Sequence, residues 1–513
     1  MKEKSRIYSS IKNIFLGVGN QILVLLLTFI TRMFFVRTLG AEYLGINGLF
    51  SNIITILSVA ELGMGSAIIY SMYKPLANND ERKISALMNF YKKIYNVVAL
   101  AISIIGIGLI PFLKYLINTS NEIENLNLYY MLFLANTVVS YLLASRSVIL
   151  NADQKLYITK IYTLVISIFQ CLLQIFVLVF TKNFVLYLIV QILCTFLVNI
   201  CGVIATKKMY PYLNNKIKLE KQDKKEIFDN MKSMFFYKIG GVILNNTSNI
   251  LISVMIGTIW VGYYSNYMMV TSSLETFTYI IFTALTASVG NLIVSTNKAK
   301  QYEIFKIINM ICNVMFGFCS VMLIVLFNDF ISIAFGEQYV LEKGMVLVIV
   351  AYFYVKGILN PIWVYRETTG MFKYTKYVAL ITAIINVILS IIFGKLWGLF
   401  GILLAPLLAR VSINIWYEPY VLNKVYFKGK SKEYFKFNFY NLIITIIITI
   451  VCECIFTIFI KKISILSLFI KGFITWIITI GIYYMIYRKT YEFKYIKTNI
   501  IDKIKNVARK TNY

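Results

Sequence analysis

Apolar segments recur along the whole chain, separated by short charged breaks or breaks rich in Gly and Asn. Most are about 20 residues long or longer, the length that an α-helix needs to cross the hydrocarbon core of a bilayer. The pattern predicts about fourteen membrane-spanning helices and leaves little chain for a soluble domain. The predicted spans are residues 13–36, 43–72, 88–110, 126–150, 158–180, 185–206, 233–256, 264–291, 305–328, 342–364, 376–394, 399–424, 437–460 and 466–487.

The composition supports an all-α polytopic membrane protein. Of 513 residues, 59% are hydrophobic and 14% charged, whereas a soluble domain has about 25% charged residues. The chain has no histidine, which excludes histidine-based triads, histidine metal sites and acyl transfer with an imidazole base. All seven cysteines lie in apolar segments and are interpreted as core residues. The sequence therefore predicts no catalytic site, no metal site and no cofactor.

Positive charge is abundant and unevenly placed. The chain carries 51 Lys and Arg against 23 Asp and Glu, a net charge of +28. In a polytopic protein such an excess indicates a membrane surface rather than nucleic acid. With the N-terminus inside, most basic residues fall on cytoplasmic segments, as the positive-inside rule requires. We therefore expect both termini on the cytoplasmic side of the cell membrane. The densest basic runs, 207–232 and 488–513, either contact anionic lipids or act only as topology signals.

The two halves of the chain resemble each other at an offset of 217 residues. Leu39–Gly45 matches Ile256–Gly262, and each stretch has two glycines five positions apart with an aromatic residue between them. A parallel repeat is the architecture of transporters that rock two lobes around a central site, although gene duplication without transport remains an alternative. The predicted domains are an N-lobe (1–206, helices 1–6), a basic cytoplasmic linker (207–232), a C-lobe (233–424, helices 7–12), and an extra helix pair with a basic tail (425–513).

Charged side chains inside the spans are the candidate functional residues, because charge within a bilayer is costly and marks substrate or ion pathways. The candidate cations are Arg32, Arg146, Lys238, Lys356 and Arg410. We expect them to line a cavity between the lobes. The first three lie near helix ends and have snorkelling to the interface as an alternative role. For the deeper Lys356 and Arg410 the alternative is structural pairing with a carboxylate.

Two carboxylates, Glu61 and Glu275, fall near the middle of predicted spans. Each is a candidate proton or sodium carrier, or the counter-ion of Arg32 or Arg410.

The N-terminal third resembles a known family. The stretches FVRTLGAEYLGINGLF (35–50), SVAELGMGSAIIY (58–70) and KPL (74–76) resemble Wzx-type flippases for O-antigen or capsular repeat units, of the multidrug/oligosaccharidyl-lipid/polysaccharide (MOP) exporter superfamily. The resemblance implies the MOP exporter fold and alternating access. It also implies export of undecaprenyl-pyrophosphate-linked oligosaccharide repeat units from the inner to the outer leaflet, for capsular or other surface polysaccharide.

The resemblance further implies that cavity arginines hold the pyrophosphate and any acidic sugars. Arg32, Arg146 and Arg410 are the candidates by position. The expected partners are the polyprenyl-pyrophosphate oligosaccharide, membrane lipids, a polysaccharide polymerase and a chain-length regulator. Independently of the family, guanidinium groups suit phosphate oxygens because they bind them bidentately. No Walker-type phosphate loop occurs in the sequence, which argues against direct use of ATP.

Three alternatives remain open from the sequence. A multidrug or cation antiporter of the same superfamily needs carboxylates rather than arginines in its cavity. A flippase for the lipid-linked peptidoglycan precursor shares the cationic cavity and the helix number. A membrane enzyme that polymerises or ligates lipid-linked sugars generally needs a substantial outer loop, and the predicted outer loops are short. We therefore expect a transporter and not an enzyme.

Overall fold

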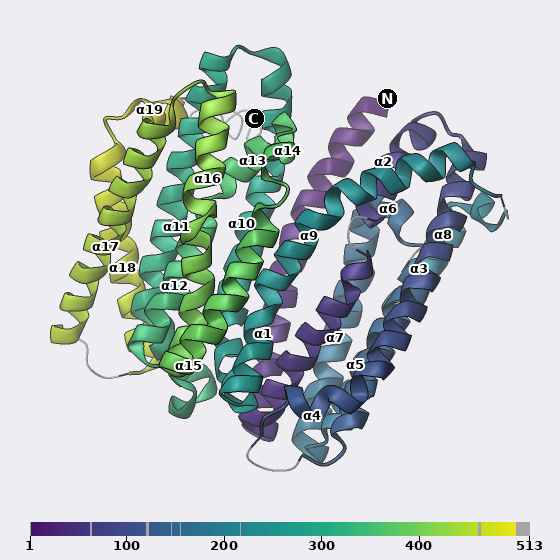
Figure 1. Ribbon diagram of the computed structural model, residues 1–513, viewed down its shortest axis with the longest axis horizontal. Helices are drawn as coiled ribbons and strands as arrows, with labels where there is room; N and C mark the ends of the chain where they lie inside the picture. Colours follow the sequence, from purple (N-terminus) through teal and green to yellow (C-terminus); the bar gives the residue numbers. More distant parts are fainter. Residues whose placement is uncertain are drawn as a thin grey trace, which may run out of the picture. The chain divides into compact units, whose positions relative to one another are not determined.

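The computed structural model describes residues 2–61, 64–119, 123–144, 146–153, 155–215, 217–459 and 463–498. Within these ranges every regular element is a helix (Figure 1). Among the described residues, ten helical segments are long and apolar enough to cross a membrane, and Leu126–Leu142 is a shorter apolar helix. The prediction of an all-α, multi-pass membrane protein is therefore confirmed.

Two of the long helices are kinked. The backbone leaves the helical region at Gly40 within α1 and at Trp397 and Gly398 within α15, so α1 contains the first predicted span and the beginning of the second, and α15 contains most of the eleventh and the beginning of the twelfth. Residue 460 of the predicted thirteenth span, and the tail from 499, lie outside the described residues. The α-helices are α1 (Lys2–Leu57), α2 (Met64–Ala77), α3 (Glu81–Leu109), α4 (Leu113–Leu116), α5 (Leu126–Ala144), α6 (Val148–Ala152), α7 (Leu156–Thr181), α8 (Phe184–Met209), α9 (Lys221–Met255), α10 (Thr258–Ser295), α11 (Lys298–Phe335), α12 (Lys343–Gly357), α13 (Asn360–Thr369), α14 (Phe372–Thr375), α15 (Val378–Ser412), α16 (Asn414–Val421), α17 (Ser431–Phe459), α18 (Ile465–Tyr487) and α19 (Tyr491–Ile496).

The second predicted span, 43–72, is interrupted in the structure. α1 ends at Leu57, a 3₁₀ turn covers Ser58–Glu61, and α2 begins at Met64. Hydroxyl groups on α3 and α5 hold the Glu61 carboxylate at this break. The contacts that accompany the break join segments far apart in the sequence, so hydrophobic periodicity alone did not reveal it.

α9 begins at Lys221, inside the segment 207–232 that was predicted as a linker. Its first turns are rich in Lys, Asp and Glu, and Asp223 lies in the first turn, where a negative charge complements the helix dipole. Before it, Asn89 donates hydrogen bonds to the carbonyls of Asn215 (2.7 Å) and Ile217 (3.3 Å). The first part of the segment is therefore attached to α3, and the second part extends the following helix.

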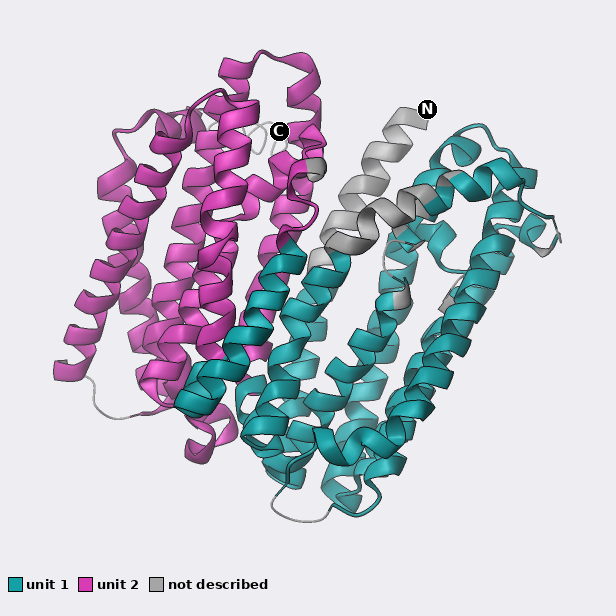
Figure 2. Ribbon diagram, in the orientation of Figure 1, with its two compact units in different colours: residues 1–265, 379–402 teal, residues 266–378, 403–513 magenta. Residues whose placement is uncertain are grey.

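By internal contacts the chain forms two compact units (Figure 2). Unit 1 consists of residues 1–265 and 379–402. Within it α7 packs against α1 and α8, and α5 packs against α3 and α8. An aromatic cluster around Phe184 joins several of these helices, with ring centroids 5.6 Å from Phe35, 5.4 Å from Tyr43 and 4.9 Å from Tyr129. The division into two units reflects internal contacts and does not test the lobe boundaries predicted from the sequence. The N-lobe (1–206) and the C-lobe (233–424) therefore stay predictions.

Unit 2 consists of residues 266–378 and 403–513. α11 is its central helix and packs against α12, α17 and α18. The core there contains Val321, Ile448 and Tyr483. Lys471 of α18 donates to Asp329 of α11 at 2.6 Å, and their side chains are 10% and 13% exposed. The C-terminal helix pair is thus attached to unit 2 by apolar packing and a largely buried ion pair.

Large apolar side chains are exposed along many helices. On α7 they recur every three or four residues and include Val165, Ile168, Leu172, Phe176 and Phe180. An exposed apolar stripe of this length is unfavourable in water and is suited to lipid chains.

The two loops that matched in the sequence each contain a glycine with positive φ. Gly40 has a φ of 84° and Gly257 has a φ of 140°, and these glycines occupy equivalent positions at the offset of 217 residues. L-residues rarely adopt positive φ, whereas glycine does so at no steric cost. Both loops therefore need glycine at this position for the same physical reason.

Candidate functional site

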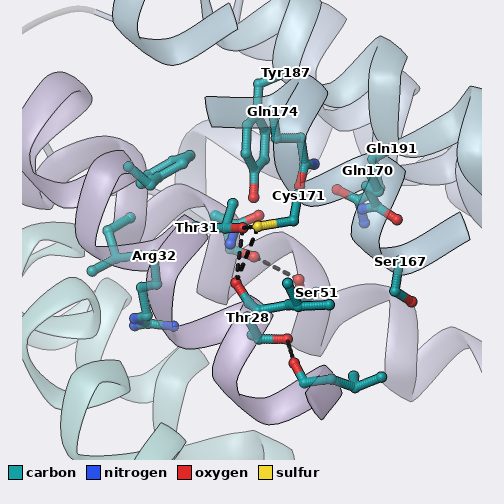
Figure 3. A pocket seen from close by; sticks show the side chains of 15 residues that line it. Thr28, Thr31, Arg32, Ser51, Ser167, Gln170, Cys171, Gln174, Tyr187 and Gln191 are labelled. Carbon is teal, nitrogen blue, oxygen red and sulfur yellow. Dashed lines mark hydrogen bonds between the residues drawn. The ribbon is translucent and has the colours of Figure 1, made fainter. Parts of the chain in front are cut away.

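A polar cavity of about 350 Å³ lies within unit 1, with walls from α1, α7 and α8. All three helices are long and apolar enough to span a membrane. Figure 3 shows the side chains that line it. The apolar lining residues are Val24, Leu27, Phe35 and Leu44. The others carry polar or sulfur atoms: Thr28, Thr31, Arg32, Asn47, Ser51, Ser167, Gln170, Cys171, Gln174, Tyr187 and Gln191.

The α1 wall carries hydroxyl groups that are compatible with an apolar helix. Thr28 donates to the carbonyl of Val24 at 2.8 Å, and Thr31 donates to that of Leu27 at 2.9 Å. In bonds of this kind the hydroxyl donates its proton to a carbonyl of the same helix. Its oxygen can still accept a hydrogen bond from a group in the cavity. Thr31 also lies 3.2 Å from the Cys171 sulfur, which links α1 to α7. Thr28 and the candidate cation Arg32 both line the cavity.

Arg32 gives the cavity its charge. Its Nη2 donates to the Ser265 hydroxyl, which also belongs to unit 1. Among the described residues that line this cavity, Arg32 is the only charged side chain. A guanidinium in a wall without carboxylates favours an anionic or polar ligand and disfavours a cation.

Amide side chains, which were not predicted as site residues from the sequence, form another part of the wall. Gln170 and Gln174 lie on α7, and Gln191 lies on α8. Gln174 is 4% exposed, and its Nε2 has no hydrogen-bond partner among the described residues. The available signal was two glutamines four positions apart in a mostly apolar span, a spacing that places both on one helix face.

Glu61 has a different environment from the one expected. It accepts hydrogen bonds from Tyr95 and Tyr141, the latter at 2.6 Å. Its partners are thus two neutral phenols, where the sequence pointed to Arg32 or Arg410 as its counter-ion. The physical reason is that the 3₁₀ turn directs Glu61 toward α3 and α5. Glu61 is not among the residues that line the cavity.

Arg146 and Lys238 also belong to unit 1 but not to the cavity wall. Arg146 lies between α5 and α6 and is partly buried. Its Nη1 atom is buried and has no hydrogen-bond partner within the described ranges. Lys238 lies on α9 and is also partly buried. Arg146 therefore has capacity for an additional acceptor.

In unit 2, two of the predicted residues form an ion pair. Lys356 of α12 donates to Glu275 of α10 at 2.7 Å, and their side chains are 22% and 25% exposed. Both line a second cavity of about 320 Å³, together with Asn360 and Trp363. Glu275 thus has Lys356 as its cationic partner in place of the expected Arg410 or Arg32, because both long side chains extend between α10 and α12.

Arg410 is buried against an aromatic ring. It lies on α15, is 5% exposed, and donates from Nε to the Tyr352 hydroxyl at 3.1 Å. Its guanidinium carbon is 5.2 Å from the centroid of the same ring, within range of a cation–π interaction. Arg410 lines neither of the two cavities described above.

Sequence comparison identifies the family. Residues 10–287 match the polysaccharide biosynthesis protein family. Among curated proteins, none is significantly similar to this chain.

Three solved structures show the fold. The first is the lipid II flippase MurJ in an inward closed conformation (TM-score 0.64, 17% identity, covering 93% of this chain and 99% of that chain). The second is an inward-facing multidrug resistance MATE family transporter of the MOP superfamily (TM-score 0.58, 13% identity, covering 79% of this chain and 97% of that chain). The third is a MOP superfamily transporter from Pyrococcus furiosus, described as having a binding pocket of reverse polarity (TM-score 0.53, 14% identity, covering 82% of this chain and 96% of that chain).

The chain shares the fold of these solved transporters, two of which are described as members of the MOP superfamily. The match over residues 10–287 covers more than half of the sequence. The chain belongs to the polysaccharide biosynthesis protein family, and the resemblance noted in the sequence is confirmed at this level.

Proposed function

We propose that this protein moves polyprenyl-pyrophosphate-linked oligosaccharide repeat units from the inner to the outer leaflet of the cytoplasmic membrane, for assembly of a surface polysaccharide. The observation that carries the proposal is the cavity of unit 1, whose described lining residues include one guanidinium, several amide and hydroxyl groups and no carboxylate. A pyrophosphate needs fixed cations inside a membrane protein, and a sugar needs hydrogen-bonding groups.

Arg32 holds phosphate oxygens or an acidic sugar in this mechanism, while alternating access exposes the substrate first inside and then outside. Arg146 adds a second cation in unit 1, outside the cavity wall, and its buried Nη1 has no partner among the described residues. Outward movement of two negative charges down an inside-negative potential of roughly 100 mV releases about 4.6 kcal/mol. Export of such an anion therefore does not require coupling to an ion gradient.

The peptidoglycan precursor is the second candidate substrate, because the similar MurJ structure is a lipid II flippase and that substrate is also a lipid-linked sugar. The two are distinguished by depletion of the protein. Loss of surface polysaccharide with normal growth supports the proposal, whereas lysis with intact surface polysaccharide supports the precursor.

A drug or cation exporter is disfavoured by the charge of the cavities. The cavity in unit 1 has no acidic lining residue among the described side chains. In unit 2, Glu275 is already neutralised by Lys356 at 2.7 Å. A cationic drug therefore has no unpaired carboxylate to bind in either of these two cavities.

The position in the cell follows from the same proposal. Both termini lie in the cytoplasm, where the basic segments meet anionic lipids. The exported repeat unit then passes to a polysaccharide polymerase and a chain-length regulator on the outer side. The protein itself forms and breaks no covalent bond.

The deciding experiment measures transbilayer movement in vesicles that contain the purified protein and lipid-linked oligosaccharide from its own cell. Movement is scored by access of a glycan-modifying enzyme added outside. We expect Arg32→Gln to slow movement at least tenfold. Arg37→Gln is the matched control, because Arg37 is exposed on the same helix and does not line the cavity. Equal rates for both variants and the wild type would refute the role of Arg32.

A further inference from the structure

We propose that the amide wall of the unit 1 cavity, formed by Gln170, Gln174 and Gln191, is a sugar-binding subsite that reads the hydroxyl groups of one ring of the transported glycan. The inference rests on the proposed function and adds to it. Arg32 gives affinity for negative charge, whereas the amide wall selects which sugar is carried.

The strongest observation is the state of Gln174. Its side chain is 4% exposed, yet Nε2 has no partner among the described residues. A buried amide donor without an acceptor is unfavourable, and nearly all such groups in proteins are satisfied. Gln174 also lines the cavity, so in this proposal a ligand group there serves as the acceptor once the terminal amide turns toward it.

The chemistry of the wall fits a neutral sugar. Each glutamine offers a carbonyl acceptor and two N–H donors, which matches neighbouring hydroxyl groups that both donate and accept. Three glutamines line one cavity here, and Asn47, Ser51 and Ser167 add further groups of the same neutral kind. A cation or an apolar drug would leave most of these uncharged hydrogen-bonding groups without partners.

An aromatic face accompanies the amides. Tyr187 and Phe35 both line the cavity, and their ring centroids are 5.1 Å apart in an edge-to-face arrangement. Sugar rings have an apolar face of C–H groups that packs on aromatic rings. The cavity therefore offers both surfaces that a sugar ring needs, polar groups for its edge and an apolar face for its flat side.

The size of the cavity limits the ligand. About 350 Å³ is near the lower end of the roughly 300–1,000 Å³ typical of small-molecule sites. That volume suits one or two sugar rings and not a whole lipid-linked repeat unit. In Figure 3, Arg32 lies at the left of the view and Gln170 and Gln191 at the right. We infer that the two regions of the wall contact different parts of one substrate.

The test separates sugar recognition from phosphate recognition. The probe is the oligosaccharide released by mild acid from the cell's own lipid-linked repeat units, which carries neither lipid nor pyrophosphate. Its binding to detergent-purified protein is followed by saturation-transfer NMR, and flipping of the intact lipid-linked form is measured in vesicles in parallel.

The variants are Gln174→Leu and Gln191→Leu. Gln21→Leu serves as the matched control, because Gln21 is a partly buried glutamine of α1 that does not line the cavity. We expect the two cavity variants to weaken binding of the released oligosaccharide at least tenfold and to raise the half-saturating concentration for flipping. Gln21→Leu is expected to change neither, and thermal unfolding identifies any variant that is misfolded.

Each outcome decides a different point. If wild type flips the lipid-linked form and both cavity variants bind the released oligosaccharide as wild type does, the subsite is refuted and the proposed function stands. If wild type neither flips the lipid-linked form nor binds the oligosaccharide, the proposed function fails and the subsite fails with it. If only Gln174→Leu unfolds, Gln191→Leu decides, because Gln191 lies on a different helix.

Discussion

Gly262 lies against Gly45: a β-carbon on Gly262 would sit 3.2 Å from the amide nitrogen of Gly45 and would collide with the carbonyl oxygen of Ala41. In the reciprocal contact, a β-carbon on Gly45 would collide with the carbonyl oxygen of Thr258. Ala41 and Thr258 are equivalent at the offset of 217 residues, as are Gly45 and Gly262. The two repeated loops therefore pack on each other with local two-fold symmetry, and both belong to unit 1.

This close packing predicts that Gly45→Ala and Gly262→Ala destabilise the protein. The atoms in the way are backbone carbonyls, which cannot rotate aside, and overpacking of this kind costs about 1–3 kcal/mol. The measurement is thermal unfolding in detergent. Gly241→Ala is the control, because no atom lies within 4 Å of its β-carbon position and alanine favours the helix by up to about 1 kcal/mol. Equal melting temperatures for all three variants would contradict the packing argument.

Arg32→Lys tests whether the cavity uses the guanidinium fork or only a positive charge. Lysine keeps the charge and loses the planar, bidentate geometry that matches phosphate. We expect a flipping rate between those of wild type and Arg32→Gln, several-fold below wild type. A rate equal to that of wild type would show that charge alone is sufficient.

Arg146→Met is predicted to keep the fold and to slow transport. The Nη1 atom of Arg146 is buried without a partner among the described residues, so its removal relieves an unfavourable group. The expected result is an unchanged or higher melting temperature with a flipping rate reduced at least several-fold. A lower melting temperature with a normal rate would instead indicate a structural role.

The ion pair between Arg366 and Glu418 is predicted to stabilise unit 2. The two side chains are 4% and 1% exposed and lie 3.1 Å apart, and Trp363 donates to the same carboxylate at 2.8 Å. Arg366→Met leaves a buried charge uncompensated, which costs about 3–5 kcal/mol. The exposed pair of Lys300 and Glu303 is the control, and Lys300→Met is expected to leave the unfolding midpoint unchanged. Equal midpoints for both variants would refute the prediction.

The pair of Lys356 and Glu275 is predicted to behave as a structural counter-ion pair. Lys356→Met alone is expected to cost less than the roughly 3–5 kcal/mol of a buried pair, because both side chains are about a quarter exposed. The double variant Lys356→Met with Glu275→Gln is expected to restore both stability and flipping. If the double variant is stable but does not transport, the pair has a direct role in the transport cycle.

Much of the fold was predictable because the bilayer constrains the sequence strongly. A helix that crosses a membrane must be apolar over about 20 residues, so the spans were visible without any contact information. The repeat was visible for a similar local reason. Gly40 and Gly257 both have positive φ, a conformation that favours glycine. A glycine therefore occurs at the same position in both halves of the sequence.

The candidate site was only partly predictable. Charge in a span is conspicuous, so Arg32 was found, and the structure places it in a cavity wall. Gln174 was missed although its spacing from Gln170 was visible in the sequence, because only the structure shows that Gln174 is buried, has no partner among the described residues and lines the cavity. Which carboxylate meets which cation was not predictable either, since Glu275 and Lys356 are far apart in the chain.

The sequence by itself therefore determined the class of protein, the spans, the repeat and the positions of charge, because each follows from local composition and from the requirements of the bilayer. Only the tertiary structure decided which of those charges pair, which line a cavity, and which neutral groups join them. These outcomes depend on contacts between helices such as α1 and α7, and the distances of such contacts do not appear in any local pattern.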